Sequence, residues 1–278
     1  MSTRPLSLVV HGAGGRMGRR VVALAVEDQQ VHLIGGVESS SHPLIGSDLG
    51  TIAGMAPIGV LLGSGWPSGA GAVIDFSLPT AVRGCVDACL KTGTPLVVAT
   101  TGLEAEQKKL LLEAAKSIAV CWAPSMSLAV NLTMRLAQQV TSALKGLSSG
   151  VDIEIIERHH RFKEDAPSGT ALKFGQIIAS ELEQDAAVEV RHQHGREGKT
   201  GARPRHEIGY HAVRVGDNPG EHTIVFGMLG ERIELNVAAS NRDCYATGAI
   251  AAAKWLQTKP PGMYDMFDVL GLNDASVG

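Results

Sequence analysis

A short segment of the chain, Glu157 to Thr170 (ERHHRFKEDAPSGT), gathers side chains suited to acid–base chemistry and to anion binding. His159 and His160 are adjacent, and Lys163 follows shortly after them. An imidazole can donate a proton near neutral pH, and an ammonium group can hold a carboxylate or stabilise developing negative charge. A packed or solvated histidine pair and a surface lysine are the ordinary alternatives. The segment thus contains a candidate general acid and a candidate anion clamp.

The end of this segment has the features of a helix start. Ser168 follows Pro167 and is a favoured N-cap residue, and Gly169 and Thr170 fall in the first helical turn. The N–H groups of a first turn have no intrahelical partner, so they can bind a carboxylate or a phosphate. We therefore expect an anion-binding helix end here.

The charges of the segment favour an anionic substrate over a metal ion. Arg158, Arg161 and Lys163 would repel one another unless an anion occupied the space between them. Two histidines and an aspartate could bind zinc, but adjacent residues of an extended segment point in opposite directions. We therefore expect no metal in this segment.

A glycine cluster, Gly12 to Gly18 (GAGGRMG), lies between a predicted strand and a predicted helix. Such a turn lets the backbone approach a pyrophosphate, and the helix N-terminus supplies free N–H groups and positive potential. Glu38 ends the next predicted strand, where an acid can accept hydrogen bonds from the adenosine ribose. An ordinary strand–helix turn is the alternative, but strand, glycine turn, helix, strand and acid in this order favour dinucleotide binding.

The same residues bear on the choice of cofactor. The carboxylate of Glu38 would repel a 2′-phosphate, which favours NADH over NADPH. Arg16, at the mouth of the turn, could instead pair with that phosphate. Position 39 is Ser39, so no second cation adjoins Glu38. We expect NADH to be preferred and NADPH to be tolerated at best.

The elements that must position these residues form two groups. In the first group, continuous apolar strands alternate with helices, which is typical of a parallel sheet covered on both faces. We expect its strands at 6–10, 31–37, 72–76, 95–99 and 118–122, and helices after the glycine turn, at 80–91 and at 104–117. The Gly-, Ser- and Pro-rich stretch 39–69 is expected to form loops with one short strand.

The pattern changes after Val130. Helices are predicted at 132–144 and 170–183, and strands at 152–157, 187–191, 207–214, 222–227 and 231–238. Consecutive strands without intervening helices indicate an antiparallel or mixed open sheet, and hence a second domain. The chain then returns to a helix at 244–257 and a short apolar tail at 266–272.

Composition excludes several classes of protein. The formal net charge is -3 with mixed signs, and no basic stripe or polybasic helix predicts binding to nucleic acid or to a membrane surface. No apolar run is long enough to span a bilayer. Cys85 and Cys89 share one face of a predicted helix, where buried thiols are the expected state. Reduced thiols suit the cytoplasm, which is the location we expect.

These motifs, taken together, resemble the dihydrodipicolinate reductase family over nearly the whole chain. The matching segments are Gly12–Gly18, Val73–Ser77, Thr100–Gly102, Glu157–Ala171, Arg196–Arg203 and Gly220–His222. The resemblance implies NAD(P)H-dependent reduction of 4-hydroxy-tetrahydrodipicolinate to tetrahydrodipicolinate in diaminopimelate and lysine biosynthesis. It implies a Rossmann-type domain from residues 1–130 and 241–278. Residues 131–240 would form an α+β domain with an open mixed sheet, which binds substrate and builds a homotetramer.

The resemblance also implies roles for individual residues. His159 and Lys163 would be catalytic, and His160, Lys163, Ser168, Gly169 and Thr170 would hold the substrate carboxylates. The implied cofactor residues are Gly12, Ala13, Gly14, Gly15, Arg16, Met17, Gly18, Glu38, Phe76, Thr100, Gly102, Ser125 and Met126. One segment departs from the family: Ser125 to Asn131 reads SMSLAVN, where the family usually has Asn-Phe-Ser-x-Gly-Val-Asn.

Two other classes of protein would share part of this pattern. An aspartate or diaminopimelate dehydrogenase has a similar two-domain plan but lacks the His-His-x-x-Lys segment. A non-catalytic nucleotide sensor would keep the fold, but the intact His159 and Lys163 count against it.

Overall fold

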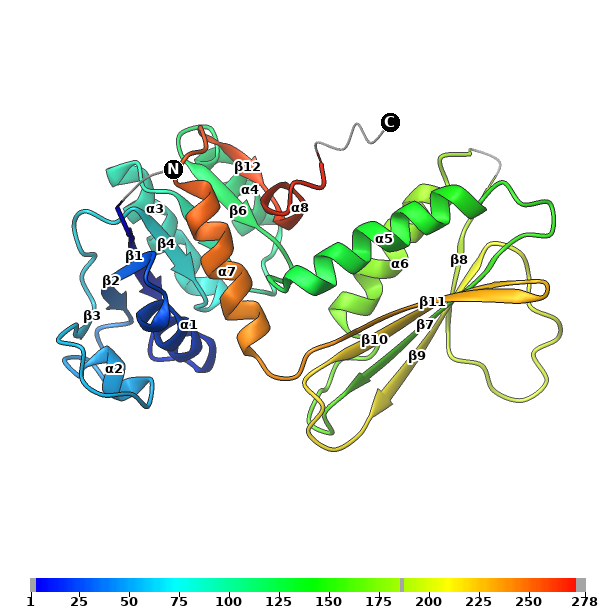
Figure 1. Ribbon diagram of the computed structural model, residues 1–278, viewed down its shortest axis with the longest axis horizontal. Helices are drawn as coiled ribbons and strands as arrows, with labels where there is room; N and C mark the ends of the chain where they lie inside the picture. Colours follow the sequence, from blue (N-terminus) through cyan, green and yellow to red (C-terminus); the bar gives the residue numbers. More distant parts are fainter. Residues whose placement is uncertain (1–3, 186–187, 274–278) are drawn as a thin grey trace. The chain divides into compact units, whose positions relative to one another are not determined.

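The computed structural model describes residues 4–185 and 188–273 of the chain (Figure 1). The chain divides into two compact units, one from Met1–Leu128 with Arg242–Gly278 and the other from Ala129–Asn241. The sequence-based boundaries were residues 130 and 241. The chain leaves the first unit at the start of α5 (Leu128–Leu144) and re-enters it just before α7 (Asp243–Leu256).

The first unit contains a seven-stranded sheet in the order β12-β6-β5-β4-β1-β2-β3. Every strand pairs in parallel with its neighbours, as expected for strands joined by helical crossovers. The strands are β1 (Leu6–His11), β2 (Val31–Val37), β3 (Leu62–Gly63), β4 (Ala72–Asp75), β5 (Leu96–Val98), β6 (Ala119–Trp122) and β12 (Gly262–Tyr264).

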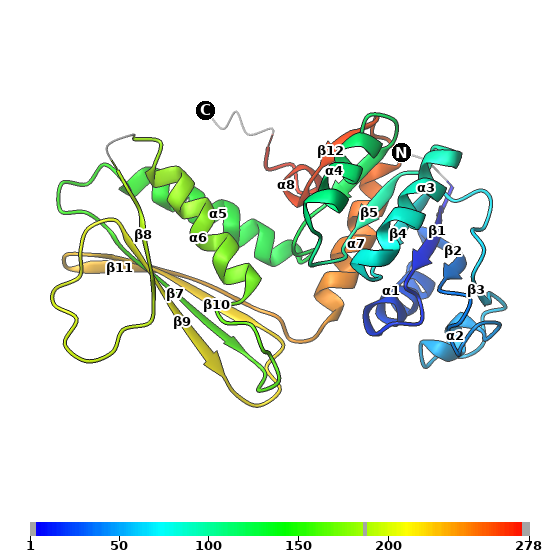
Figure 2. The ribbon, with the colours of Figure 1, turned by 180° about the vertical axis from the view of Figure 1, so that it is seen from behind.

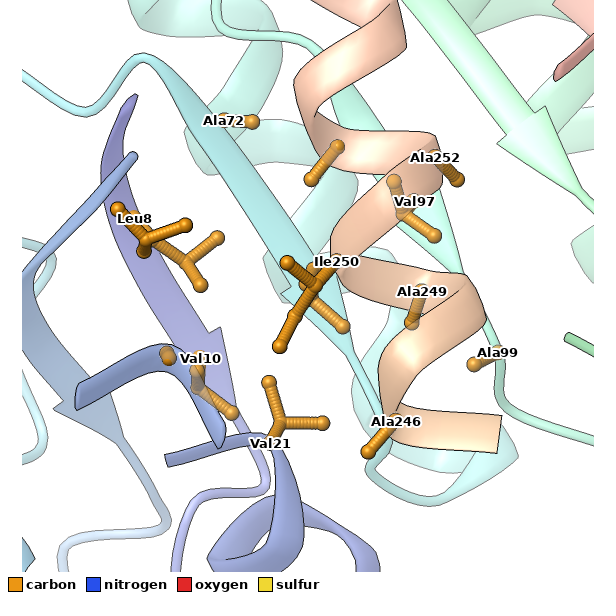
Figure 3. Packing of buried hydrophobic residues seen from close by; sticks show 14 of the residues in the cluster. Leu8, Val10, Val21, Ala72, Val97, Ala99, Ala246, Ala249, Ile250 and Ala252 are labelled. Atoms are coloured by element: carbon orange, nitrogen blue, oxygen red, sulfur yellow. The ribbon is translucent and has the colours of Figure 1, made fainter. Parts of the chain in front are cut away.

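Helices cover both faces of this sheet because successive side chains of each strand point to opposite sides. Leu8 and Val10 of β1 face a core shared with Val21 of α1 and Ile250 of α7 (Figure 3). Val9 faces the opposite core, formed with α3 and α4. The helices of this unit are α1 (Arg16–Glu27), α2 (Leu49–Ile52), the 3-10 turn η1 (Pro79–Ala81), α3 (Val82–Thr92), α4 (Ala105–Ala114), α7 and α8 (Met266–Val269). The predicted parallel, doubly covered sheet is confirmed.

The second unit contains a five-stranded sheet in the order β11-β10-β7-β9-β8. Strand β10 is antiparallel to β7 and β11, whereas β9 is parallel to β7 and β8, so the predicted mixed sheet is confirmed. Helices α5 and α6 lie along one face of it (Figure 2). The bounds are α6 (Gly169–Leu182), β7 (Asp152–His159), β8 (Arg191–His194), β9 (Glu207–Arg214), β10 (Glu221–Met228) and β11 (Glu231–Ala238).

Several element boundaries differ from the predictions. Strand β7 continues to His159, because its last residues still pair with β9 and β10. The strand predicted at 187–191 is wrong over residues 188–190, since β8 begins at Arg191 and Ala187 lies outside the described residues. The sequence also failed to predict α2 and β12, which are too short to show a periodicity. In the described ranges no helix is long and apolar enough to cross a membrane.

Candidate active site

The glycine turn of the first unit is built from close backbone contacts. Gly12 has φ +78°, and a Cβ on it would lie 2.7 Å from the Phe76 carbonyl oxygen. A Cβ on Gly18 would lie 2.0 Å from the Gly12 carbonyl oxygen. Any larger residue at Gly18 would therefore push α1 away from the turn, and this close packing is the role expected of that glycine.

Two side chains from the segment after β2 contact the turn. The Gly14 N–H donates a hydrogen bond of 3.1 Å to Oε1 of Glu38. The ring of His42 lies so close to Gly14 that a Cβ there would come within 2.5 Å of its Cε1. No sequence pattern marks His42, because it lies in the Ser-rich stretch expected to form loops. Arg16 is exposed at the first residue of α1.

These features fit a dinucleotide. A side chain at Gly12 or Gly18 would overlap backbone atoms, the N-cap residue Gly15 has no side chain to cap the helix, and a carboxylate stands at the end of β2. The first-turn N–H groups of α1 could therefore bind a pyrophosphate. Ala13 is fully buried beside this turn and Met17 packs against the core, so only their backbones would reach such a ligand.

The side chains of the other predicted cofactor residues are less accessible to a cofactor. Thr100 is buried, and its hydroxyl donates to Oδ2 of Asp75 at 2.9 Å. Met126 has a side chain 2% exposed in the core, and its carbonyl oxygen lies against Gly248. Ser125 accepts a hydrogen bond of 3.3 Å from the N–H of Ser127. Thr100 and Met126 could therefore meet a cofactor mainly through their backbones. Phe76 is half-buried and packs against the core, and Gly102 has φ +73°.

Asp75 belongs to a buried cluster at the ends of β1 and β4. Its Oδ1 lies 2.8 Å from Nδ1 of His11 and accepts the Ser77 N–H at 3.1 Å, while Oδ2 accepts from Thr100. Cys85 is close enough to complete a possible metal-ligand set with His11 and Asp75. The carboxylate is already satisfied by these hydrogen bonds, so the cluster is explained without a metal.

The second unit holds the predicted acid in a buried hydrogen-bonded pair. Nδ1 of His159 lies 2.6 Å from Oε2 of Glu157, with His159 8% and Glu157 0% exposed. Arg214 on β9 donates to both Glu157 oxygens, at 2.8 and 2.9 Å. The N–H of Ser168 donates to Oε1 of Glu157 at 3.0 Å. His159 is the last residue of β7, two residues beyond the predicted end of that strand.

Opposing influences set the protonation of this pair. Burial favours a raised pKa for Glu157, but hydrogen bonds from Arg214 and His159 outweigh it and lower that pKa. Burial lowers the pKa of His159, and the adjacent Glu157 carboxylate opposes this effect. The carboxylate is thus ionised, and its negative charge helps the imidazole to hold a second proton.

The predicted N-cap is confirmed at the start of α6. The Ser168 Oγ accepts a hydrogen bond of 3.1 Å from the Ala171 N–H and lies 3.0 Å from Nε2 of His222 on β10. Burial lowers the pKa of His222 to about 4, so its ring is neutral at neutral pH. Within the described chain nothing accepts from the N–H groups of Gly169 and Thr170, which leaves this helix end open to an anion.

Two of the three cations of the segment have carboxylate partners of their own. Arg158 pairs with Glu221 at 2.8 Å, and Nζ of Lys163 lies 2.8 Å from Oδ1 of Asp165. The guanidinium of Arg161 lies 6.0 Å from the centroid of the Phe162 ring. The expectation of a bound anion among the three cations stays a prediction. His160 differs from them: its Nδ1 is buried and has no hydrogen-bond partner among the residues that the structure describes.

Sequence reasoning found the local residues of this site and missed the distant ones. Glu157 was only the boundary of the motif, although the alternation of a strand places it on the same side as His159. Arg214 and His222 lie on β9 and β10, and only the pairing of these strands with β7 brings them to the motif.

The sequence of this chain matches those of known proteins across both units. The family models described as "Dihydrodipicolinate reductase, N-terminus" and "Dihydrodipicolinate reductase, C-terminus" match residues 6–126 and 129–270. A 4-hydroxy-tetrahydrodipicolinate reductase of Rhodopirellula baltica is 64% identical over 98% of this chain and 99% of its own length. Another, from Alkalilimnicola ehrlichii, is 44% identical over 98% of this chain and 100% of its own.

A solved structure shows the same fold. The dipicolinate-bound dihydrodipicolinate reductase from Paenisporosarcina sp. TG-14 superposes with a TM-score of 0.73 at 23% identity. The superposition covers 95% of this chain and 98% of that one. The two family models match both units, and the Rhodopirellula baltica reductase is 64% identical over nearly the full length of both chains; this chain is therefore an oxidoreductase that belongs to the dihydrodipicolinate reductase family.

Proposed function

We propose that this chain reduces 4-hydroxy-tetrahydrodipicolinate to tetrahydrodipicolinate with NAD(P)H, in the biosynthesis of diaminopimelate and lysine. The observation that carries the proposal is the buried His159–Glu157 pair, which adjoins Lys163 and the open start of α6. The names of the relatives that match nearly the whole chain support the same substrate.

In this proposal the second unit binds and protonates the substrate. The bound nicotinamide cofactor supplies hydride to a ring carbon of the dehydrated, conjugated imine. His159 donates the proton that neutralises the charge developing on the ring, as a general acid. Lys163 exchanges Asp165 for a substrate carboxylate, and His160 and the N–H groups of Gly169 and Thr170 hold the carboxylates. Ser168 keeps that helix start in place through its capping hydrogen bond.

The first unit would bind the cofactor. We propose that the turn from Gly12 to Gly18 contacts the pyrophosphate and that Glu38 accepts from the adenosine ribose, so that NADH is preferred to NADPH. Phe76, Thr100, Gly102, Ser125 and Met126 would line the nicotinamide end. The proposed reaction thus draws on residues of both units.

The assembly and location are also proposals. We propose a cytoplasmic homotetramer formed through the sheet of the second unit. The face of β7 opposite α6 carries half-buried residues such as Ile156, and Val213 on β9 is 39% exposed. Apolar side chains on an open sheet face are suited to contact with another copy of the chain.

The decisive experiment is NADH oxidation, followed by absorbance, with freshly prepared 4-hydroxy-tetrahydrodipicolinate. We expect His159→Gln to lower kcat by about 10²–10⁴-fold with little change in KM, the usual effect of losing a general acid. His32→Gln, on an exposed position of β2, is the matched control and should turn over normally.

Wild-type turnover in His159→Gln would remove the acid role. No oxidation by the wild type would remove the reductase function and favour a nucleotide sensor.

A further inference from the structure

We infer that Glu157 is a positioning residue for the reaction: its carboxylate fixes the tautomer and orientation of His159 and ties that ring to the start of α6. The inference rests on the proposed role of His159 as general acid. It adds a residue of β7 that has no direct contact with the substrate in this proposal.

The contact with Glu157 determines which ring nitrogen of His159 exchanges the proton. Glu157 and His159 lie on the same side of β7, and Oε2 approaches Nδ1 to 2.6 Å. An ionised carboxylate only accepts hydrogen bonds, so Nδ1 must carry a hydrogen in both charge states of the ring. Nε2 is then the nitrogen that gains and loses the proton. A ring held in this way presents one defined acid position to a substrate.

The Glu157 carboxylate is itself held in place by further hydrogen bonds. Arg214 binds both oxygens of Glu157 in the bidentate geometry typical of a strong pair, at 2.8 and 2.9 Å. The Ser168 N–H occupies Oε1 from the other side at 3.0 Å. One fully buried carboxylate therefore links β7, β9 and the start of α6, where the substrate carboxylate is proposed to bind.

The ring of His159 lies beside Gly220 and the ring of His222. A Cβ on Gly220 would lie 3.0 Å from His159 Nε2, so the glycine leaves room at this nitrogen. The ring of His222 stands edge-on to His159, with centroids 5.3 Å apart. The charged or titratable groups that act on His159 are thus Glu157, Lys163, Arg214 and His222. Of these only Glu157 is negative, so it alone favours the protonated ring.

A double-mutant cycle separates positioning from mere structural support. We expect Glu157→Gln to lower kcat by about 10–100-fold, below the loss in His159→Gln, because the acid remains but its orientation is no longer fixed. If Glu157 acts through His159, adding Glu157→Gln to His159→Gln costs no further activity. A full additional loss in the double variant would show a separate structural role and would overturn the inference.

The pH profile gives a second readout. Because the carboxylate opposes the lowering of the His159 pKa by burial, Glu157→Gln should move the alkaline limb of kcat to lower pH. Glu154→Gln is the matched control: it removes a carboxylate from the same strand, held by Arg196 and Arg203, without touching His159. This control should keep the wild-type kcat and limb. An unmoved limb in Glu157→Gln would contradict the inference.

A measurement on the wild type keeps the inference testable even if Glu157→Gln does not fold. Long-range ¹H–¹⁵N spectra report the tautomer of each histidine, and His159→Gln identifies the signals of His159. We expect a neutral ring protonated at Nδ1; a ring protonated at Nε2 instead would refute the inference. Failure of the proposed function is distinguishable, because the wild type would then oxidise no NADH with the substrate whatever the tautomer, whereas loss of the acid role alone would leave His159→Gln active.

Discussion

At the scale of single residues, Glu38 is the side chain that bears most directly on the choice between NADH and NADPH. It follows β2, its backbone N–H donates to the Gly63 carbonyl oxygen at 2.9 Å, and its Oε1 accepts from Gly14. The carboxylate is thus held at the turn proposed to bind the pyrophosphate. A ribose hydroxyl could bond to it, whereas a 2′-phosphate would meet a like charge.

Glu38→Gln should therefore change cofactor preference without abolishing turnover. We expect the ratio of kcat/KM for NADH to that for NADPH to fall by about 10–100-fold, the usual worth of a hydrogen bond to a charged group. Steady-state kinetics with both cofactors measure the ratio. Glu27→Gln, an exposed acid at the end of α1, controls for a general change in charge. If Arg16 instead decides the preference, Glu38→Gln will leave the ratio where it was.

How far sequence could predict the site depends on how far apart the residues lie in the chain. His159, Lys163 and Ser168 fall in one short segment, so residue type and spacing were enough to propose them. Arg214 lies 57 positions from Glu157, and His222 lies 54 positions from Ser168. Their contacts depend on strand register, which residue types alone do not specify. Glu221, the partner of Arg158, is missed for the same reason. Asp165 lies only two positions from Lys163, but the spacing of the two residues does not show that their side chains pair.

At the scale of elements, the contact between β1 and α1 depends on a glycine within the helix. Gly18 costs helix propensity, but a Cβ there would overlap the Gly12 carbonyl oxygen and the Ala13 Cα, at 2.0 and 2.6 Å. Backbone atoms cannot move aside as a flexible side chain can. An added methyl group must therefore displace the whole N-terminal turn of α1.

Gly18→Ala should destabilise the chain by about 1–3 kcal/mol, the usual cost of overpacking, and weaken NADH binding. Gly84→Ala is the matched control, because Gly84 lies in α3 with nothing within 4 Å of an added Cβ. It should be neutral or stabilising by up to about 1 kcal/mol. Urea unfolding and NADH fluorescence titration measure the two effects. If both variants had the same stability and the same affinity for NADH, α1 would be able to shift without loss of stability or binding.

Long elements with clear periodicity were predicted well, and short or half-exposed ones were not. The alternation of apolar runs and helices was enough for the parallel sheet, where β2 begins and ends as expected, and β9 of the mixed sheet also has the expected bounds. The three residues of β12 are all half-buried at the edge of the sheet, so no apolar run marks them. The prediction also missed the position of β8, because its sequence, RHQH, is polar and mostly exposed.

At the scale of the whole molecule, resistance to acid depends on carboxylates that the fold keeps ionised. Glu154 is the clearest case, on the face of β7 opposite Glu157. Burial would raise its pKa, but hydrogen bonds from Arg196, His211 and Arg203 outweigh this and lower the pKa to about 2. Its carboxylate crosses over Gly209 of β9, where a Cβ would lie 1.9 Å from Oε2. The network thereby connects β7, β9 and the segment between β8 and β9.

The sign of the resulting pH dependence follows from this lowered pKa. A carboxyl group whose pKa is about 2 when folded, against an ordinary value of 4.5, stabilises the fold fully above about pH 4.5. That contribution is lost as the pH falls toward 2. Glu154→Gln should thus cost about 1–3 kcal/mol at neutral pH, and the gap to the wild type should close on acidification.

Urea midpoints of both proteins at neutral pH and near pH 3 measure the gap. Glu234→Gln provides the comparison: among the described residues this exposed acid on β11 pairs with Arg232 of the same strand alone, so the change should alter stability little. A gap between wild type and Glu154→Gln that stays constant down to the lowest pH would mean that the carboxylate contributes through packing and not through its charge.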